Sequence, residues 1–390
     1  MFHLLLFIIY LAFISLGLPD ALLGSAWPNM VQEFHVPLSY AGYISFIISA
    51  CTVISSLQVN RMVAWLGSGK TTAISTFMTA ISLFGFAMSS SYWMLLIWAI
   101  PYGLGAGCVD ACLNNYVANH FASRHMSWLH CMWGIGAFSG PLVMGAFLTH
   151  NFHWSSVYFS IGVLQAILTI ILFITLSKWQ KDTLEEDQII IPLKELLKMR
   201  KAQYIILFFF CYCAIEHTVG LWASSYFTLV KGMDKNIAAT LGSLFFIGIA
   251  FGRFISGFLT YKFNDKQMIL LGMILIICSI GCMLLPGTTL AFIAFCLCGL
   301  GCAPLYPSMM HSIPMLFDKN TSQSVFGIAS AAANAGIMII PPIFGMIASH
   351  LSISLLPYFL IIFFLLMFIM NKYLWHNQNS EKNSEKIVKK

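Results

Sequence analysis

Apolar residues form long runs along most of this chain, and short polar segments separate the runs. Most runs have about 20 residues or more, which is the length that a helix needs to cross the hydrocarbon core of a bilayer. They are not divided into segments of about ten residues with alternating hydrophobicity, as strands of a membrane barrel are. The pattern therefore predicts an all-helical membrane protein. We place twelve spans at residues 2–34, 39–60, 71–89, 92–120, 126–149, 153–177, 202–230, 236–261, 267–285, 288–316, 322–349 and 352–374.

One long hydrophilic segment, 178–201, divides the spans into two groups of six. We expect an N-terminal half at 1–177, a cytoplasmic linker at 178–201, a C-terminal half at 202–374 and a polar, disordered cytoplasmic tail at 375–390. Three leucines among the lysines of the linker are compatible with a short helix at the membrane surface, and a solvated linker is the alternative. These leucines are Leu193, Leu196 and Leu197.

The composition excludes a water-soluble fold. Of the 390 residues, 59% are hydrophobic and only 9% are charged, whereas soluble proteins have about 25% charged residues. The eleven cysteines are scattered without metal-ligand spacing, so we expect them to be small packing residues, and we expect no metal and no cofactor. The sequence also shows no cluster of nucleophiles that would indicate an enzyme.

The net charge of +6 does not indicate a nucleic-acid-binding protein, because the basic residues lie in short loops and in the tail. Cytoplasmic loops of membrane proteins carry an excess of Lys and Arg. With both termini in the cytoplasm, 18 of the 20 Lys and Arg residues lie on that side, and only Lys231 and Lys235 lie outside. We therefore predict a monomeric, multi-pass protein of the cell membrane, with a bacterial inner membrane as the expected location and both termini cytoplasmic.

The chain also repeats itself at an offset of about 200 residues. Two halves that repeat in parallel are typical of transporters in which the substrate site lies between the halves near the middle of the membrane. Alternating access then comes from rocking one half against the other. The repeated features are Gly103-Leu-Gly105 with Gly299-Leu-Gly301, Asp20 with Glu216, and Pro141 with Pro341.

Span four carries polar residues where apolar ones are expected. Asp110 and Asn114 are four residues apart and share one face of a helix. Gly103 and Gly107 lie on the same side and would let another backbone come close. A charged group within the bilayer usually faces a bundle interior or a water-filled cavity, so this segment is a candidate site.

Only three of the 14 acidic residues are expected at membrane depth, namely Asp20, Asp110 and Glu216. A carboxylate that is removed from water binds a proton more readily than one in solution. We assign the coupling proton to Asp110, with Asp20 as the second candidate and Glu216 as the third. The alternative for each acid is a structural hydrogen-bonding role inside the bundle.

Four stretches carry a resemblance to a known family. They are Gly17-Leu-Pro-Asp-Ala-Leu-Leu-Gly-Ser-Ala-Trp-Pro28, Asn60-Arg61 with Leu66-Gly-Ser-Gly-Lys70, Gly103-Leu-Gly105 with Asp110 and Asn114, and Trp128-Leu-His-Cys-Met-Trp-Gly-Ile-Gly-Ala-Phe-Ser-Gly-Pro141. With the two halves, they make the chain similar to the major facilitator superfamily and, within it, to the fucose-permease-like branch of proton-linked sugar carriers. The resemblance implies a fold of two pseudo-symmetric six-helix halves and a proton-coupling role for Asp110.

The stretch around Arg61 and Lys70 resembles a degenerate form of the superfamily's cytoplasmic loop signature, and Arg253 is its counterpart in the second half. The resemblance implies that these three residues act in gating. We expect them to pair with acids or helix C-termini at the cytoplasmic gate.

Six side chains are candidates for contact with a substrate. Amides and imidazoles bond hydroxyl groups, and aromatic rings stack on the C–H faces of sugars. The alternative for each is a packing role or a hydrogen bond between helices. By the resemblance, a histidine and a tryptophan replace the permease's glutamine and asparagine in span five, which argues against recognition of the same sugar. The candidates are Asn114, His130, Trp27, Trp133, Tyr306 and Asn334.

These observations predict a secondary active transporter that moves a small polar organic solute, with sugars as the leading class, by proton-coupled symport. A proton-driven exporter of a drug, siderophore or metabolite on the same fold is the main alternative, because membrane acids serve both directions. A receptor or scaffold that does not transport is the alternative from another class. The expected partners are the solute, protons and the lipid bilayer.

Overall fold

The structure, a computed structural model, describes residues 2–121, 123–179, 193–317 and 319–388. Within these ranges, all regular secondary structure is helical. The N-terminal half contains α1 (Phe2–Asp20), α2 (Leu22–Phe34), α3 (Tyr40–Leu66), α4 (Ser68–Ala87), α5 (Tyr92–His120), α6 (Ser123–Thr149), α7 (Trp154–Ile174) and the 3-10 helix η1 (Leu176–Lys178). The rest contains α8 (Leu193–Leu196), α9 (Arg200–Leu229), α10 (Lys235–Leu241), α11 (Ser243–Leu259), α12 (Asp265–Leu284), α13 (Thr288–Leu316), α14 (Lys319–His350), the 3-10 helix η2 (Ile353–Leu355) and α15 (Leu356–Val388).

Twelve long helical segments correspond to the predicted spans when α1 with α2, and α10 with α11, are each counted as one broken span. In the described part of the chain, eleven of them are long and apolar enough to cross a membrane, and α4 is the exception. This helix is rich in Ser and Thr, and it packs against α5 and α7. Four of its hydroxyls donate to carbonyls of the same helix, as Thr72 does to Ser68 (2.8 Å) and Thr76 to Thr72 (2.9 Å). Self-bonded hydroxyls let a polar helix lie inside an apolar bundle.

The two halves repeat one pattern of neighbours. In the N-terminal half α1 packs against α6, and α5 packs against α3 and α4; in the C-terminal half α9 packs against α14, and α13 against α11 and α12. Glycines occupy matching contacts, because Gly103 meets the carbonyl of Ile48 on α3 and Gly299 meets that of Phe245 on α11. The arrangement is the predicted fold of two pseudo-symmetric six-helix halves.

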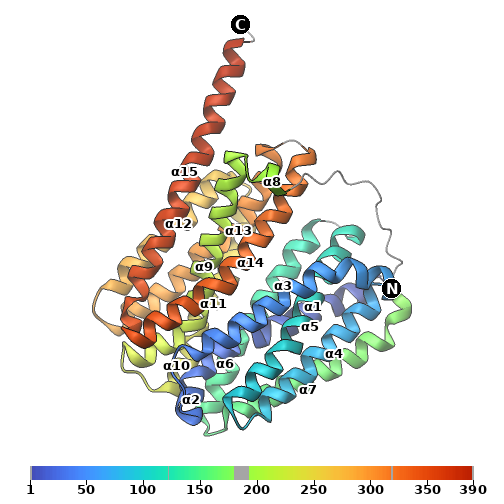
Figure 1. Ribbon diagram of the computed structural model, residues 1–390, viewed down its shortest axis with the longest axis vertical. Coiled ribbons are helices and arrows are strands. Elements are labelled where there is room, and N and C mark those ends of the chain that lie inside the picture. Colours follow the sequence, from blue (N-terminus) through green and yellow to red (C-terminus); the bar gives the residue numbers. More distant parts are fainter. Residues whose placement is uncertain (1, 122, 180–192, 318, 389–390) are drawn as a thin grey trace.

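The halves meet through α3 with α14, α6 with α10 and α11, and α2 with α9. In Figure 1 the two sets of helices converge around α2 and α10 and spread apart toward α8. We call the first end, which carries residues 35–39, 150–153 and 230–234, the closed end, and the other end the linker end. Two hydrogen bonds join the halves at the closed end: Ser39 N–H to Ser349 Oγ (2.7 Å) and Lys235 Nζ to Gln32 Oε1 (2.6 Å).

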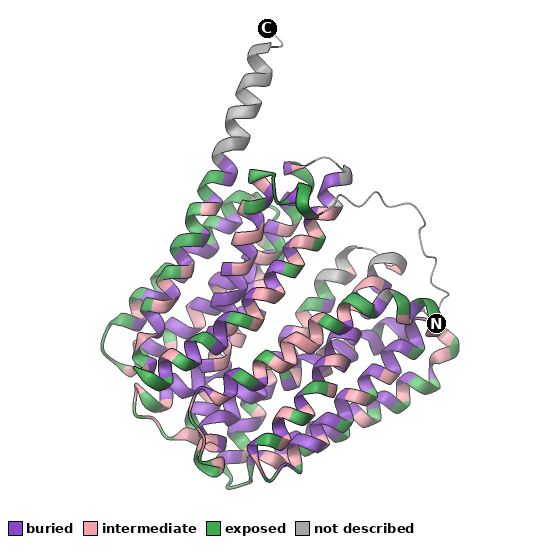
Figure 2. Ribbon diagram, in the orientation of Figure 1, coloured by how far each residue is buried: buried purple, intermediate pink, exposed green. Residues whose placement is uncertain are grey.

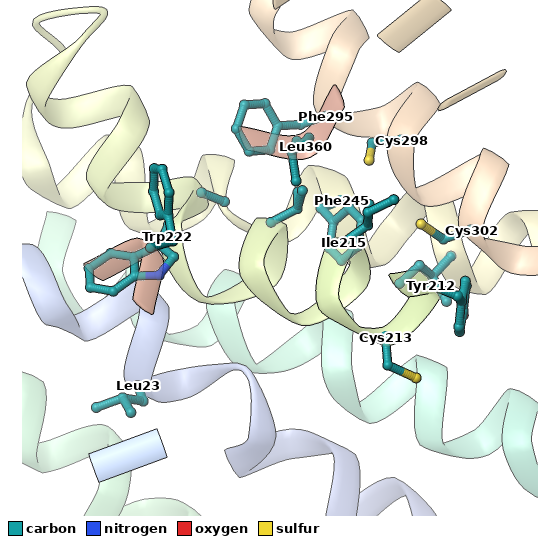
Figure 3. Packing of buried hydrophobic residues seen from close by; sticks show 14 of the residues in the cluster. Leu23, Tyr212, Cys213, Ile215, Trp222, Phe245, Phe295, Cys298, Cys302 and Leu360 are labelled. Atoms are coloured by element: carbon teal, nitrogen blue, oxygen red, sulfur yellow. The ribbon is translucent and has the colours of Figure 1, made fainter. Parts of the chain in front are cut away.

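Apolar packing is continuous through the C-terminal half and across the closed end. Figure 2 shows buried residues concentrated inside each half and where the halves converge. In Figure 3, side chains of α9 such as Trp222 pack with those of neighbouring helices, and Leu23 from α2 lies in the same cluster. Trp222 is fully buried and donates its indole N–H to the carbonyl of Pro341 (3.0 Å).

The C-terminal helix and the linker add detail to the sequence prediction or differ from it. The helix α15 continues to Val388, so it includes most of the stretch that was expected to be a disordered tail, and it projects beyond the bundle in Figure 1. Within the linker, α8 begins at Leu193, and Leu196 is buried against the C-terminal half. Residues 180–192 of the predicted linker lie outside the described residues.

Candidate functional site

A polar cluster lies between the halves, and its first member is Asp20 at the end of α1. Tyr102 on α5 donates its hydroxyl to Asp20 Oδ1 (3.0 Å), and Trp133 on α6 donates its indole N–H to Oδ2 (2.8 Å). Asp20 is exposed although its helix runs through the bundle. The carboxylate therefore faces open space inside the protein and not a packed core.

A break in the helix places this carboxylate. Pro19 has no backbone N–H, so the carbonyl of Ser15, four residues earlier, lacks its usual helical partner. That carbonyl accepts a hydrogen bond from the side-chain amide of Gln165 on α7 (2.8 Å). The helical run then ends at Asp20, and α2 begins at Leu22. The proline thus fixes both the end of α1 and the position of the acid.

The second acid, Asp110 on α5, accepts a hydrogen bond from the amide of Asn114 (3.0 Å), which lies on the same helical face, as predicted from the spacing of four residues. Asn114 Oδ1 is buried and has no hydrogen-bond partner in the described part of the chain. The charges of Asp110 and Asp20 are close enough to interact. Two acids with neutral donors therefore lie in one region of the N-terminal half.

The glycine face of α5 packs as predicted. A Cβ on Gly103 would meet the carbonyl of Ile48, and one on Gly107 would meet that of Thr52, both on α3. Thr52 donates its hydroxyl to the Gly103 carbonyl (3.2 Å). This close backbone contact holds α5, and with it Asp110, against α3.

The C-terminal half contributes an ion pair. Arg253 Nη2 on α11 lies 3.6 Å from Glu216 Oε1 on α9, and both side chains are largely buried. The guanidinium also lies over the ring of Trp133, 5.3 Å from its centroid. Arg253 was expected at the cytoplasmic gate, but it lies in the central cluster, where it connects the acid of its own half to an aromatic residue of the other half.

Two further candidates lie near this cluster, and a third lies on another helix of the C-terminal half. His130 on α6 is exposed and meets the ring of Phe13 edge-on, with centroids 6.0 Å apart, and its imidazole lies within range of the charge of Arg253. Tyr306 on α13 is half-buried against Phe209, 5.1 Å away between centroids. The third candidate, Asn334, is half-buried on α14.

Three other predicted residues are not brought into the cluster. Trp27 is fully buried near the closed end and donates its indole N–H to the carbonyl of Leu38 (2.8 Å). Arg61 is exposed and donates to Gln58 on its own helix (3.3 Å), and Lys70 is exposed near the start of α4. The structure therefore gives Trp27 a packing position and places Arg61 and Lys70 at the linker end.

Sequence reasoning missed two residues of this region. Tyr102 bonds Asp20 directly, but nothing marks it among 14 tyrosines. Gln165 had a signal, because an amide in an apolar run is the same feature that singled out Asn114. Gln165 is buried, and its side-chain amide donates to the carbonyl of Ser15, which Pro19 leaves without a helical partner.

The arrangement offers carboxylates, an amide and an imidazole beside aromatic rings, and the side chains of Asp20 and His130 are exposed. Within the described residues, no group of three or more His, Cys, Asp or Glu side chains is placed to hold a metal ion. Such a lining can bond hydroxyl groups and contact apolar faces of a small solute.

Comparisons with known proteins agree with this architecture. The family model of the Major Facilitator Superfamily matches residues 9–289 and 219–389. The glucose/mannose transporter GlcP of Bacillus subtilis is 23% identical over 352 residues, covering 84% of each chain. The sodium-dependent glucose transporter 1A of Mus musculus is 23% identical over 87% of this chain and 89% of its own length.

Other proteins that are similar to this chain have names that do not refer to sugars. Bypass of stop codon protein 6 of Saccharomyces cerevisiae is 24% identical over 88% of this chain and 77% of its own. Among solved structures, a mutant of the nucleoside transporter NupG has a TM-score of 0.75 at 14% identity, over 95% of this chain and 98% of that one. A bacterial homologue of the lysosomal transporter Spinster, described as inward-facing and occupied, has a TM-score of 0.74 at 13% identity over 97% of both chains. These structural likenesses extend over nearly the whole fold.

Proposed function

We propose that this chain, which belongs to the major facilitator superfamily, imports a small polyhydroxylated solute of the sugar class together with protons. Membership of the family makes the chain a multi-pass membrane transporter. The class of the solute and the identity of the coupling ion are what we propose. The names of the relatives GlcP, a glucose/mannose transporter, and sodium-dependent glucose transporter 1A support a sugar.

The environment of Asp20 is the observation on which the proposal rests. Its carboxylate is exposed inside the bundle, and an indole N–H and a phenol hydroxyl hold it in place. The carboxylate of Asp20 is oriented by Trp133 and lies beside its ring. Together with the amide–acid pair of Asn114 and Asp110, it provides hydrogen-bonding groups for hydroxyls next to an aromatic surface. A hexose presents both kinds of surface.

The partners of the two acids favour proton coupling. Trp133, Tyr102 and Asn114 are neutral, so a carboxylate that gains a proton leaves no uncompensated charge beside it. Loss of the negative charge lowers the cost of closing the cavity around the solute. Proton binding and closure are thereby linked at the same residues.

In alternating access, the closed end would open while the linker end closes. The inter-half bonds of Ser39 and Lys235 lie at the closed end, and the halves spread apart toward α8. With the cytoplasmic linker and termini that the basic residues favour, this state is open to the cytoplasm. The opposite state then requires that the contacts of the closed end separate.

Uptake into proteoliposomes tests the proposal. We expect purified protein to accumulate radiolabelled glucose, mannose or fucose when the outside is acidified, and a protonophore to abolish the accumulation. Trp133→Ala should lose uptake, while Trp65→Ala, an exposed tryptophan on α3, should retain it. A sodium gradient that drives uptake without a proton gradient would overturn proton coupling. No uptake of any of the three sugars would overturn the solute class, and proton-driven efflux would favour the exporter.

A further inference from the structure

A polar pocket lies at the closed end, away from the central cluster. Its volume is about 470 Å³, within the roughly 300–1,000 Å³ typical of small-molecule sites. It is lined from both halves, by α2, the turn between α6 and α7 and the start of α10. We call it the outer pocket, and the residues that matter here are Asn29, Glu33, Asn151, Phe152, Lys235 and Asn236.

The charged groups of the outer pocket are already held in place. Glu33 Oε2 lies 2.9 Å from His153 Nε2 and also accepts the indole N–H of Trp154. Lys235 Nζ donates to Gln32 Oε1 across the boundary between the halves. The carboxylate of Glu33 and the ammonium of Lys235 therefore already have partners within the protein. A neutral ligand can bind beside them without breaking these contacts.

The amides of the outer pocket are not used in the same way. Asn29 Nδ2 is buried and lacks a hydrogen-bond partner in the described part of the chain. Asn151 is exposed and Asn236 is half-buried, and the side chains of both form no hydrogen bond among the described residues, so they are open to a ligand. The ring of Phe152, beside Asn151, is 57% exposed. Three amides from three elements and one open aromatic face match the chemistry of a sugar, with donors and acceptors for hydroxyls and a surface for C–H groups.

We propose that the outer pocket binds a second molecule of the polyhydroxylated solute, and that this molecule holds the closed end shut. The inference rests on the proposed function, which supplies the solute class. Asn29 and Asn151 belong to one half and Asn236 to the other, so the pocket is complete only while the halves meet. A ligand that binds one state better than another shifts the population toward that state. Solute at high external concentration therefore slows the return of the transporter to its outward-open state.

Direct binding to the purified full-length protein is the first test. With glucose, mannose and fucose as probes, we expect two classes of sites for the transported sugar, the weaker in the outer pocket. The double variant Asn151→Ala/Asn236→Ala should weaken only that class, with its Kd raised about tenfold or more. Unchanged affinity of the tight class shows that the variant is folded. Ile237→Ala, an exposed neighbour on α10 that does not line the pocket, is the matched control and should behave as wild type.

Uptake kinetics provide the second test. We expect the initial rate of the wild type and of Ile237→Ala to pass through a maximum and fall as external solute rises, whereas the double variant saturates without falling. A single class of sites in a wild type that still transports the sugar would overturn this inference alone. A second class that the double variant leaves intact would do the same. A wild type that neither binds nor transports any of the three sugars would overturn the proposed function and this inference together.

Discussion

In the N-terminal half, Asp20 is held by the neutral donors Tyr102 and Trp133, whereas in the C-terminal half Glu216 lies 3.6 Å from the guanidinium of Arg253. A proton on Asp20 leaves its neighbours neutral. A proton on Glu216 would leave a buried guanidinium without a counter-charge, which is costly in a medium of low dielectric constant. The comparison indicates that two halves with one fold have different electrostatic tasks. We infer reversible proton binding in the first half and a fixed ion pair in the second.

The repeat sharpens this difference. The position in α13 that matches Asp110 in α5 is Tyr306, at the same offset of 196 that relates Asp20 to Glu216. The second half thus keeps one acid and pairs it, and it has a phenol where the first half has its other acid. Arg253 then connects the two arrangements, because its guanidinium lies over the ring of Trp133, which bonds Asp20.

The largest effect on transport is expected from neutralising the acids of the first half. Asp20→Asn or Asp110→Asn should abolish proton-driven accumulation in proteoliposomes while solute exchange persists. One charge crossing 100 mV is worth about 2.3 kcal/mol, which corresponds to roughly fiftyfold accumulation that these variants would lose. Full accumulation by both variants would contradict the assignment of proton binding to this half.

The ion pair of the second half should act mainly on stability. Glu216→Gln leaves Arg253 buried without its partner, and we expect a loss of about 3 kcal/mol in the free energy of unfolding. Glu216→Gln/Arg253→Gln removes both charges and should recover most of that loss in a denaturation experiment. If the double variant were as unstable as the single one, the two residues would not act as a pair.

The shared packing of the halves can be tested at their matching glycines. Gly103→Ala and Gly299→Ala each place a methyl group against a backbone carbonyl of the neighbouring helix, and we expect each to cost about 2 kcal/mol of stability. Gly281 on α12 has no atom within 4 Å of a Cβ, so Gly281→Ala is the control and should be neutral or stabilising by at most about 1 kcal/mol. Thermal denaturation in detergent measures all three. A loss of stability in only one of the two variants would show that the two halves do not share this packing.

The smallest effect is expected where the halves touch. Trp133→Phe removes the indole N–H from Asp20 but keeps a ring for Arg253. Because Asp20 is exposed and water can replace the donor, we expect about 1 kcal/mol, or roughly a fivefold weaker solute affinity. Calorimetric binding measures this, with Trp65→Phe as the exposed control. A loss of proton coupling in Trp133→Phe would mean that the indole N–H does more than orient the acid.

The fold was predictable because hydropathy and repeat offsets act over many residues. The spacing of Gly103 and Gly107 predicted a close helix contact, which the structure contains, and the spacing of Asp110 and Asn114 predicted that they share one face, where they form a hydrogen bond. These are contacts of one helical face, so sequence periodicity carries them.

The site was harder to predict because it depends on how far each residue lies along its helix and which way it points. Trp27 and Trp133 look alike as tryptophans in apolar runs, yet the first bonds a carbonyl in the core and the second bonds Asp20. Arg253 lies within reach of Glu216 through the packing of α9 and α11, which no local pattern records. Tyr102 is identified only by its partner.

The hydroxyl-rich helix α4 has a consequence for how the chain enters the membrane. Helices are inserted during synthesis according to their apolarity, and α4 is the one long segment in the described part of the chain that falls short of it. Four of its hydroxyls, those of Thr72, Thr76, Thr79 and Ser82, donate to carbonyls of the same helix, and its neighbours are α5 and α7. We expect α4 to wait at the insertion machinery until the more apolar α5 has been synthesised, and the two to enter the bilayer as a hairpin. The order of insertion in the first half would then follow from the threonines and serines that make α4 the least apolar of these segments.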